Sequence, residues 1–269
     1  MKMNILFYCP FRFNINSKNL LSLGGIESLN IELCKNLAKK KFNIYLATYC
    51  SKEIKKKNLK NIPIKNINNY KDNIRFDIIV SSNYPNIFNS FRNSKKILWM
   101  HNTLAIEKAF RKNKLLSILK NNITAVFVSK YLESQTSNLY LFNKKIIIPN
   151  FLSNKFIVNK SNYKRKNNLI WSVQREKGLK ETMDIWVNYI YPKNKKTKLF
   201  IFGIDKSKFI KLKNYYKKYN IIFFGRVKKD KLKKIYETSL GMICLGYDET
   251  FCLNAIEANA CGLPVITNW

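Results

Sequence analysis

The stretch GMICLGYDETFCLNAIEANACGLPVIT, residues 241–267, carries the clearest structural pattern in the chain. The apolar run at its start predicts a strand, and a polar loop over residues 246–250 follows it. A helix is expected from about residue 251 to 260, and Gly262 and Pro264 then end it. The last residues predict a second strand. A strand, a helix and a strand in this order are typical of a parallel sheet covered by helices.

The same alternation runs through the rest of the chain. Runs of β-branched and aromatic residues predict strands at residues 4–8, 43–48, 77–81, 96–100, 124–128, 144–148, 169–172, 198–202 and 221–224. Helical periodicity is clearest in residues 26–40, where Ile26, Leu29, Leu33 and Leu37 share one face. Further helices are expected at residues 179–189 and 229–238. The fold class is therefore α/β, with doubly wound parallel sheets.

A polar stretch rich in lysine and asparagine interrupts the alternation and predicts a linker. We expect one Rossmann-like domain over residues 1–152, the linker over 153–168, and a second Rossmann-like domain over 169–269. Trp269 falls at or just after the fifth strand of the second domain, with no closing helix. We therefore expect the second domain to be incomplete, because its last strand would expose apolar surface.

Lysine dominates the charge of the chain. There are 50 basic and 16 acidic residues and a formal net charge of +34, with 43 Lys against 7 Arg and with 36 Asn, a mix that AT-rich codons would produce. Nucleic-acid readers favour arginine for bidentate contacts, so nucleic-acid binding is disfavoured. A solvated lysine surface and a weak attraction to anionic membranes stay open as interpretations.

The cysteines and the histidine argue against a zinc site. The six cysteines form no CxxC pair, and His101 is the single histidine. Reduced thiols in a cytoplasmic protein are the preferred interpretation. No apolar run approaches the about 18 residues that a membrane helix needs.

Three smaller motifs are candidates for ligand contacts. Gly24 and Gly25 open the first long helix, where free N–H groups suit phosphate or sugar oxygens, although a simple turn explains them equally well. The G-x-G-x-x-G motif is absent, which disfavours an NAD enzyme. A lone histidine is usually structural, but His101 follows a strand, the usual place for ligands in open sheets, which favours a functional role. Arg175 and Lys177 sit in a strand-to-helix turn and would neutralise a diphosphate, unless they are ordinary solvated cations.

The loop and helix of the opening stretch hold the most specific candidate site. Glu249 precedes the helix, and Cys252, Leu253 and Asn254 would supply free N–H groups at its start. Glu257 lies more than one turn into the helix. Two carboxylates that flank a phosphate site would each accept hydrogen bonds from vicinal hydroxyls, one pair on a donor sugar and the other on a ribose.

The segment ETFCLNAIEANACGLPVIT, residues 249–267, resembles the hallmark of the family-four retaining glycosyltransferases. In that hallmark two acidic residues, with seven residues between them, are followed by A-x-A-C-G-x-P-V-I. Shorter matches occur in the family's order: GGIE at 24–27, WMHN at 99–102, IPN at 148–150, EKGL at 176–179 and FGRV at 224–227. The resemblance covers the whole chain, but only residues 249–267 are highly specific.

The resemblance implies a GT-B fold, in which two Rossmann-like domains face a cleft, here with the second domain truncated. It implies transfer of a hexose from a UDP or GDP sugar to a glycan or lipid-linked acceptor, with retained configuration. The product would belong to a cell-surface polysaccharide or a lipopolysaccharide. No metal is implied, and the chain lacks a D-x-D motif. The protein would be cytoplasmic or peripheral on the inner face of the membrane.

The resemblance also implies a role for each matching residue. In the first domain, Gly24 and Gly25 would approach the donor diphosphate or the acceptor, and His101 would line the sugar pocket. In the second domain, Lys177 would pair with the diphosphate, the backbone near Val227 would receive the base, Glu249 would contact the donor sugar and Glu257 would hold the ribose.

Two positions depart from the family's pattern. An arginine usually lies five residues before the lysine, where this chain has Ser172, so Arg175 is the candidate replacement. A glycine is common where this chain has Cys252. The alternative to an enzyme is an inactive GT-B fragment, or a basic protein that associates with an anionic membrane or nucleic acid.

Overall fold

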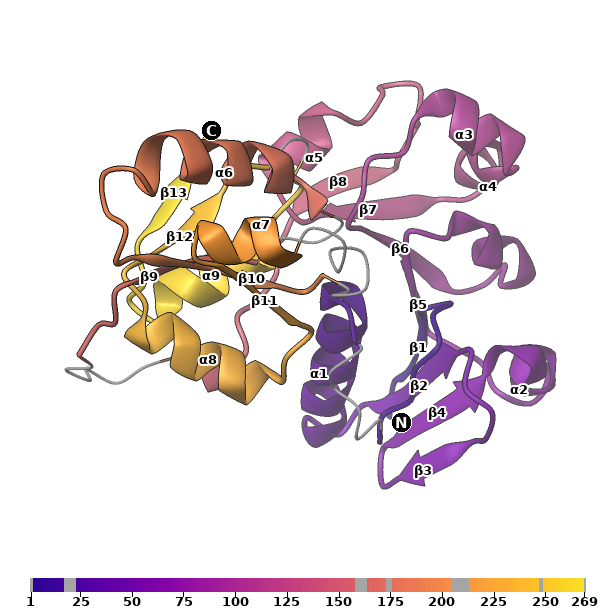
Figure 1. Ribbon diagram of the computed structural model, residues 1–269. Coiled ribbons are helices and arrows are strands. Elements are labelled where there is room, and N and C mark those ends of the chain that lie inside the picture. Colours follow the sequence, from indigo (N-terminus) through magenta and orange to yellow (C-terminus); the bar gives the residue numbers. More distant parts are fainter. Residues whose placement is uncertain are drawn as a thin grey trace. The chain divides into compact units, whose positions relative to one another are not determined.

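The computed structural model describes residues 2–16, 23–157, 164–172, 176–204, 213–246 and 249–268. The chain divides into two compact units, and the division in the main chain falls between Phe151 and Leu152. Each unit consists of a mainly parallel sheet with helices on its faces (Figure 1). This confirms the predicted α/β class with two Rossmann-like domains.

The first unit is built on an eight-stranded sheet with the order β3-β4-β2-β1-β5-β6-β7-β8. Its strands are β1 (Asn4–Tyr8), β2 (Asn43–Thr48), β3 (Ile54–Lys56), β4 (Leu59–Pro63), β5 (Ile78–Ser82), β6 (Lys95–Met100), β7 (Ile123–Phe127) and β8 (Lys144–Ile147). All neighbouring strands pair in parallel except β3 and β4. The order reverses between β1 and β5, because strands β2 and β4 lie on one side of β1 and the later strands on the other.

Five α-helices of the described residues belong to this unit: α1 (Gly25–Lys39), α2 (Ile67–Asn73), α3 (Ile106–Arg111), α4 (Lys114–Leu119) and α5 (Lys130–Ser134). The buried face of α1 differs from the predicted one. Leu29 is buried as expected, but Ile26, Leu33 and Leu37 are only partly buried. The other buried residues of the helix are Asn30, Ile31 and Cys34. The polar Asn30 is tolerated there because its amide donates to the Ser82 hydroxyl across 3.1 Å.

The antiparallel hairpin of β3 and β4 was absent from the predicted elements. It falls in the densest lysine run of the chain, where an alternating pattern is hard to recognise. The lysines of β3 are exposed, whereas β4 is buried along most of its length. Exposed lysines suit an edge strand because they discourage pairing with other chains.

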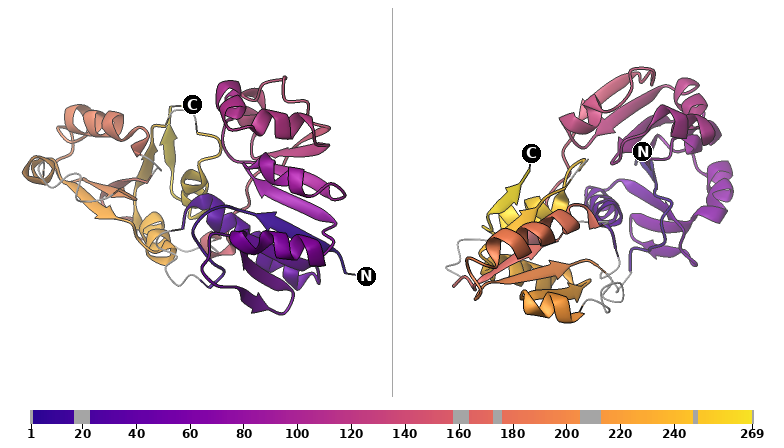
Figure 2. Two further views of the ribbon diagram at one scale, coloured as in Figure 1. Left: turned by 90° about the vertical axis from the view of Figure 1, so that its right-hand side faces the viewer. Right: turned by 45° about the horizontal axis from the view of Figure 1, so that its top comes forward.

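The second unit is built on a five-stranded parallel sheet with the order β11-β10-β9-β12-β13. Its strands are β9 (Asn168–Trp171), β10 (Lys198–Phe202), β11 (Ile221–Gly225), β12 (Gly241–Cys244) and β13 (Val265–Thr267). The helices are α6 (Leu179–Ile185), which continues into a π-helical turn (Trp186–Ile190), α7 (Lys213–Lys218), α8 (Lys229–Thr238) and α9 (Leu253–Ala260). Helices α6 and α7 lie on one face of the sheet, and α8 and α9 on the other (Figures 1 and 2).

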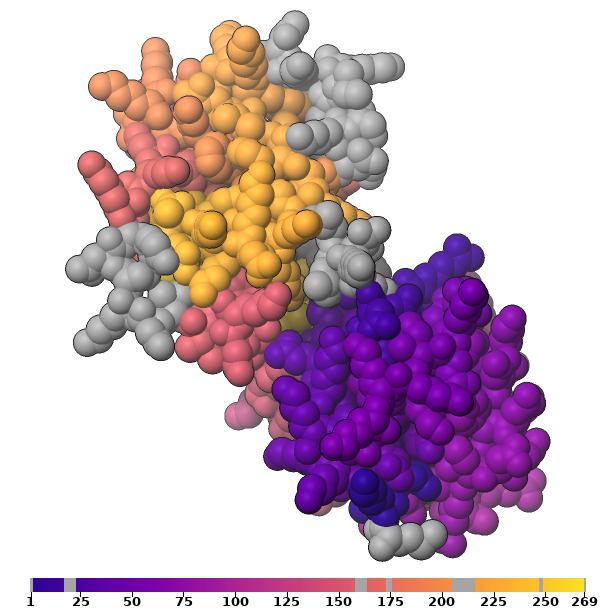
Figure 3. Space-filling view, turned by 90° about the horizontal axis from the view of Figure 1, so that it is seen from below, coloured from indigo at the N-terminus to yellow at the C-terminus, as the bar shows by residue number. Residues whose placement is uncertain are grey.

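The described part of the predicted linker, residues 153–168, packs on the second unit. Phe156, in the short 3-10 helix η4 (Asn154–Phe156), is completely buried in that unit's core. Helix η4 contacts α8 and α9 on the face shown in Figure 3. Further along, the Arg165 guanidinium donates to the carbonyls of Ser239 and Gly262, across 2.6 and 2.5 Å. The sequence did not predict these contacts, because one aromatic residue and one arginine make them within an otherwise polar stretch.

Within the part of the chain that the structure describes, no helix is both long enough and apolar enough to cross a bilayer.

We expect Phe156→Ala to destabilise the second unit by about 3 kcal/mol or more, because it removes a fully buried aromatic ring and leaves a cavity. Chemical denaturation followed by tryptophan fluorescence measures this change. The matched control is Ile157→Ala, because the next side chain is 55% exposed and its loss should change stability by less than about 0.5 kcal/mol. Equal losses for the two variants would show that η4 is not part of the core.

Candidate functional site

The carboxyl ends of β9 and β12 form the centre of the site in the second unit. The strand order reverses between these two neighbours, because β10 and β11 continue from β9 on one side and β13 lies beyond β12 on the other. Ligands of open α/β sheets bind at such a reversal, outside the carboxyl ends of the strands. The loops that follow the two strands carry Lys177 after β9, and Glu249 and Cys252 after β12.

Gly178 holds these two loops together. Its backbone has a φ of 65°, in the left-handed region, and a Cβ atom at this position would overlap the carbonyl oxygen of Leu245. Only glycine therefore allows the turn between β9 and α6 to lie directly on the end of β12. Because Lys177 is the preceding residue, this contact fixes the lysine beside the loop that follows β12.

Lys177 and Glu249 meet across the two loops. The ammonium of Lys177 lies 3.3 Å from a carboxylate oxygen of Glu249. The lysine side chain is 33% exposed and that of the glutamate 16%, so both charges are accessible at the edge of the sheet. A cation and an anion held side by side can stabilise opposite charges that develop at two ends of one bond.

Cys252 is the residue before the first turn of α9, and its backbone is left-handed, with a φ of 37°. This conformation explains why a glycine is favoured at the position, since a side chain costs about 1 kcal/mol there. The sulfur of Cys252 lies 3.4 Å from that of Cys244, the last residue of β12. The hydrogen bond with Cys244 lowers the pKa of Cys252, against the effect of burial.

Asn254 connects α9 to the end of β9. Its side-chain amide donates to the carbonyl of Ser172 across 2.5 Å, and Ser172 is buried. Position 172, where the resembled family usually has an arginine, is thus occupied by a serine whose carbonyl anchors α9. Arg175, the candidate replacement, lies outside the described residues. The supply of ligand-facing N–H groups by Cys252, Leu253 and Asn254 stays a prediction.

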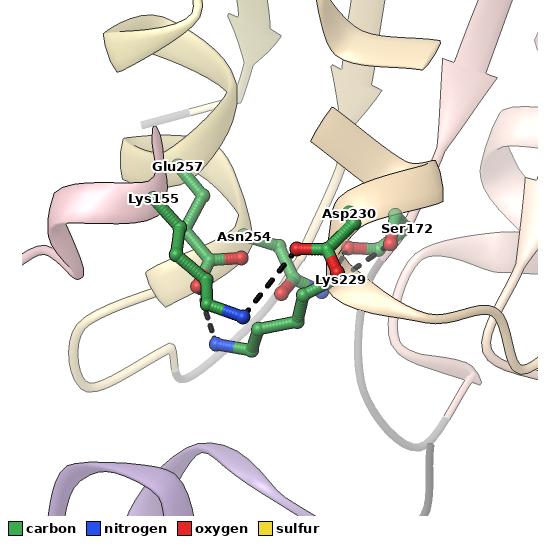
Figure 4. A network of polar contacts seen from close by, with 6 residues as sticks. All are labelled: Lys155, Ser172, Lys229, Asp230, Asn254 and Glu257. Carbon is green, nitrogen blue, oxygen red and sulfur yellow. Dashed lines mark hydrogen bonds and ion pairs between the residues drawn. The ribbon is translucent and has the colours of Figure 1, made fainter. Parts of the chain in front are cut away.

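Glu257 is buried within α9, and it meets a lysine from α8. The ammonium of Lys229 donates to a carboxylate oxygen of Glu257 across 2.7 Å (Figure 4). Val227, two residues before Lys229, is partly buried against the core of the unit. The backbone near Val227 was predicted to receive the base, and Glu257 to hold the ribose. The contact of Lys229 with Glu257 therefore brings these two parts of the chain together. A more exposed pair, Lys155 and Asp230 at 3.4 Å, lies beside them.

Two residues of this site were missed at the level of sequence. Lys229 is one of many lysines, and nothing in its surroundings distinguishes it before the fold is known. Gly178 was within a recognised match, but its contact with Leu245 involves a residue far away in the sequence. The K-G pair at the end of a strand was the available signal for Gly178.

In the first unit, the predicted residues lie at the carboxyl edge of the sheet. Gly24 and Gly25 are at the start of α1, which follows β1, and His101 follows β6, with β5 between the two strands. A Cβ atom at Gly24 would collide with the carboxylate of Glu27. The missing side chain therefore leaves room for that carboxylate beside the first turn of α1.

His101 is held in a buried position. Its backbone N–H donates to the side-chain oxygen of Asn83 across 2.8 Å, and its ring lies against that of Trp99, with the centroids 4.5 Å apart. Burial lowers the pKa of the imidazole to about 3. The ring is therefore neutral near pH 7 and supplies no positive charge.

Residues 144–268 match the family described as glycosyl transferases group 1, which confirms the predicted resemblance. No curated protein sequence matches the chain.

Several solved structures share the fold of the chain. A sucrose-phosphate synthase from Thermosynechococcus elongatus has a TM-score of 0.72 at 16% identity, over 99% of this chain and 81% of that one. WaaG, a glycosyltransferase involved in lipopolysaccharide biosynthesis, has a TM-score of 0.68 at 12% identity, over 98% and 80%. A trehalose-6-phosphate protein from E. coli, bound with UDP-2-fluoro glucose, has a TM-score of 0.66 at 11% identity, over 98% and 83%. The chain therefore has the GT-B fold.

We expect Gly178→Ala to destabilise the second unit by about 3 kcal/mol, because the new methyl group overlaps a backbone oxygen that cannot rotate away. The unfolding free energy in urea measures this loss. Gly203→Ala is the control: Gly203 also has a left-handed φ, of 84°, but a Cβ atom there would meet open space. That variant should lose only about 1 kcal/mol, from backbone strain. Losses of equal size would contradict the proposed contact with Leu245.

Proposed function

We propose that the protein is a retaining glycosyltransferase, because residues 144–268 match the glycosyl transferases group 1 family. It moves a hexose from a nucleotide-diphosphate sugar to a glycan or lipid-linked acceptor, during assembly of a cell-surface polysaccharide or lipopolysaccharide. The observation that carries this proposal is the pair of Lys177 and Glu249, 3.3 Å apart at the strand reversal of the second sheet.

The two charges suit the bond that breaks. In transfer with retention, the sugar gains positive charge as it leaves the diphosphate, and the diphosphate gains negative charge. Glu249 stabilises the sugar, and Lys177, together with the N–H groups at the start of α9, stabilises the diphosphate. The acceptor attacks from the face that the diphosphate leaves. With these groups in place, we propose that the reaction needs no metal ion.

The pair of Glu257 and Lys229 suits the nucleoside. A carboxylate accepts hydrogen bonds from both hydroxyls of a ribose. Lys229 pairs with Glu257 and holds its carboxylate in place, since a buried carboxylate without a cation would be costly. The base lies against the backbone near Val227. The bound UDP-2-fluoro glucose of the E. coli protein supports a nucleotide hexose as donor, and UDP and GDP sugars are the two donor classes to compare.

The edge of the first unit suits uncharged partners. A neutral His101 can donate and accept hydrogen bonds to sugar hydroxyls, as the sugar pocket requires. The Glu27 carboxylate beside Gly24 disfavours a diphosphate at the start of α1, because like charges repel. We therefore favour the acceptor hydroxyls over the donor diphosphate as the group that approaches Gly24 and Gly25.

We expect Glu249→Gln to reduce the turnover of the full chain by on the order of 100-fold or more, because the amide carries no charge for the sugar cation. The measurement is release of the nucleoside diphosphate from a panel of UDP and GDP hexoses, with and without glycan acceptors. Thermal unfolding without donor shows whether the variant is folded.

The matched control is Glu181→Gln, which removes an exposed carboxylate from the first turn of α6. Its turnover should equal that of the unchanged protein. If Glu249→Gln turns over at the normal rate while it is folded, the assigned role of Glu249 is wrong. If no donor raises the melting temperature of the unchanged protein, the donor site itself is wrong.

We further propose that the protein contacts an anionic membrane through α3 and α4 of the first unit. These helices pack side by side (Figure 1) and expose Phe110, Leu116 and Leu119 by 68%, 50% and 45%. The surrounding segment, residues 104–120, has five basic residues and one acidic residue. Exposed apolar groups among cations match a membrane surface, which offers both acyl chains and negative headgroups.

A neighbouring loop extends this apolar surface. The Tyr140 hydroxyl donates to the carbonyl of Leu104 across 2.9 Å, and thereby ties the loop to the segment before α3. Leu139 and Leu141, on either side of that tyrosine, are both more than 60% exposed. Large exposed apolar side chains that gather in one region mark interaction surfaces.

We expect the triple variant Phe110→Ser, Leu116→Ser, Leu119→Ser to lose vesicle binding at least about tenfold, since each side chain buries apolar area in the interface. The measurement is co-sedimentation with vesicles of phosphatidylcholine and phosphatidylglycerol, compared with phosphatidylcholine alone. The control is Tyr189→Ser in the second unit, which removes an equally exposed apolar side chain. Equal binding by both variants, or no dependence on phosphatidylglycerol, would overturn this surface.

A further inference from the structure

Two thiols are already in contact at the start of α9. Cys244 ends β12 and Cys252 precedes α9, and their sulfur atoms are 3.4 Å apart. The seven residues between them conceal this pairing in the sequence, which shows no CxxC motif. A disulfide bond is about 2.05 Å long, so the two sulfurs need only a small further approach to bond.

The two thiols are not equivalent. Cys244 is fully buried, whereas Cys252 is partly exposed and can be reached by a reagent. The hydrogen bond with Cys244, the N–H of Ala255 and the charge of Lys177 favour the thiolate of Cys252, whereas burial and the Glu249 carboxylate disfavour it. The net result is a lowered pKa of Cys252. The hydrogen bond with Cys252 and burial both raise the pKa of Cys244. A thiolate is the form that attacks a disulfide.

Cys252 also occupies an unfavourable backbone position for a side chain. Its φ of 37° belongs to the left-handed region that favours glycine. The backbone therefore gives no reason for a cysteine at this position. A reactive role for the sulfur atom would give one.

We propose that Cys252 and Cys244 form a thiol modification site that reacts with low-molecular-weight disulfides. The Cys252 thiolate attacks one sulfur of the reagent, forms a mixed disulfide and releases one thiolate. Cys244 then gives its proton to that thiolate, and its sulfur attacks the sulfur of Cys252 and expels the second thiolate. In total, two protein thiols are oxidised to one disulfide and the reagent is reduced to two thiols.

The bond would change the site described above, and this consequence rests on the proposed function. Cys252 lies three residues after Glu249, at the start of the helix that faces the diphosphate. Drawing its sulfur onto the end of β12 moves the backbone that carries Glu249 relative to Lys177. Oxidation should therefore reduce turnover, and reduction should restore it.

The experiment treats the full chain with oxidised glutathione and maps its disulfides by mass spectrometry of the digested protein. We expect a bond between Cys244 and Cys252 that dithiothreitol reverses. Cys244→Ala should instead accumulate a stable mixed disulfide on Cys252, because the second thiol is missing. Cys252→Ala should leave Cys244 unmodified, because Cys244 is buried.

Cys50→Ala is the control, since it removes a partly exposed thiol of the first unit. It should behave as the unchanged protein does. A lasting mixed disulfide on Cys252 of the unchanged protein, or a Cys252 that reacts more slowly than Cys50, would overturn the proposal. The mapping needs no turnover, so it remains decisive if the protein proves not to be a glycosyltransferase.

A second measurement tests the consequence for the donor site. Nucleotide-sugar hydrolysis of the oxidised protein should fall at least about tenfold and recover on reduction, whereas Cys244→Ala/Cys252→Ala should be insensitive to oxidised glutathione. If the bond forms and hydrolysis is unchanged, the regulatory half of the proposal is wrong.

Discussion

The close contact between Gly178 and the carbonyl of Leu245 is the constraint on which the site of the second unit depends. Parallel strands bring their following loops to the same edge, but they do not by themselves bring two loops into contact. Without a Cβ atom, the turn after β9 can lie on the end of β12. Lys177 is then fixed beside Glu249, and Asn254 can reach the carbonyl of Ser172. The two loops are thus positioned as one structure.

The charges of this unit are arranged in pairs. Acidic residues are scarce in a chain with a net charge of +34, and yet the two carboxylates of the hallmark segment each have a lysine partner. Two unpaired carboxylates would repel a diphosphate and would be costly to bury. A paired carboxylate keeps its hydrogen-bonding capacity while the local field stays close to neutral. The lysines of α8 and of the turn before α6 therefore allow acids to line a site for an anionic ligand.

The sequence predicted the parts of this arrangement that depend on local pattern. Helix α8 and strand β1 have the predicted bounds, because periodicity and strand propensity act over neighbouring residues. The same patterns could not give the contact of Lys229 with Glu257 or that of Cys252 with Cys244. Those contacts depend on how segments cross in space, and every lysine and cysteine of the chain was an equal candidate. The hairpin of β3 and β4 was missed for another reason, since its lysines masked a short alternation.

The candidate sites of the two units differ in their charge. At the strand reversal of the second sheet, Lys177 offers a cation and the start of α9 offers a positive dipole end, and both favour a diphosphate. At the corresponding edge of the first sheet, His101 is neutral and the Glu27 carboxylate lies beside Gly24. That edge can bind hydroxyls but disfavours anions. In the proposed reaction, the donor diphosphate would bind at the cationic edge of the second sheet, and an acceptor hydroxyl would bind at the uncharged His101 edge of the first.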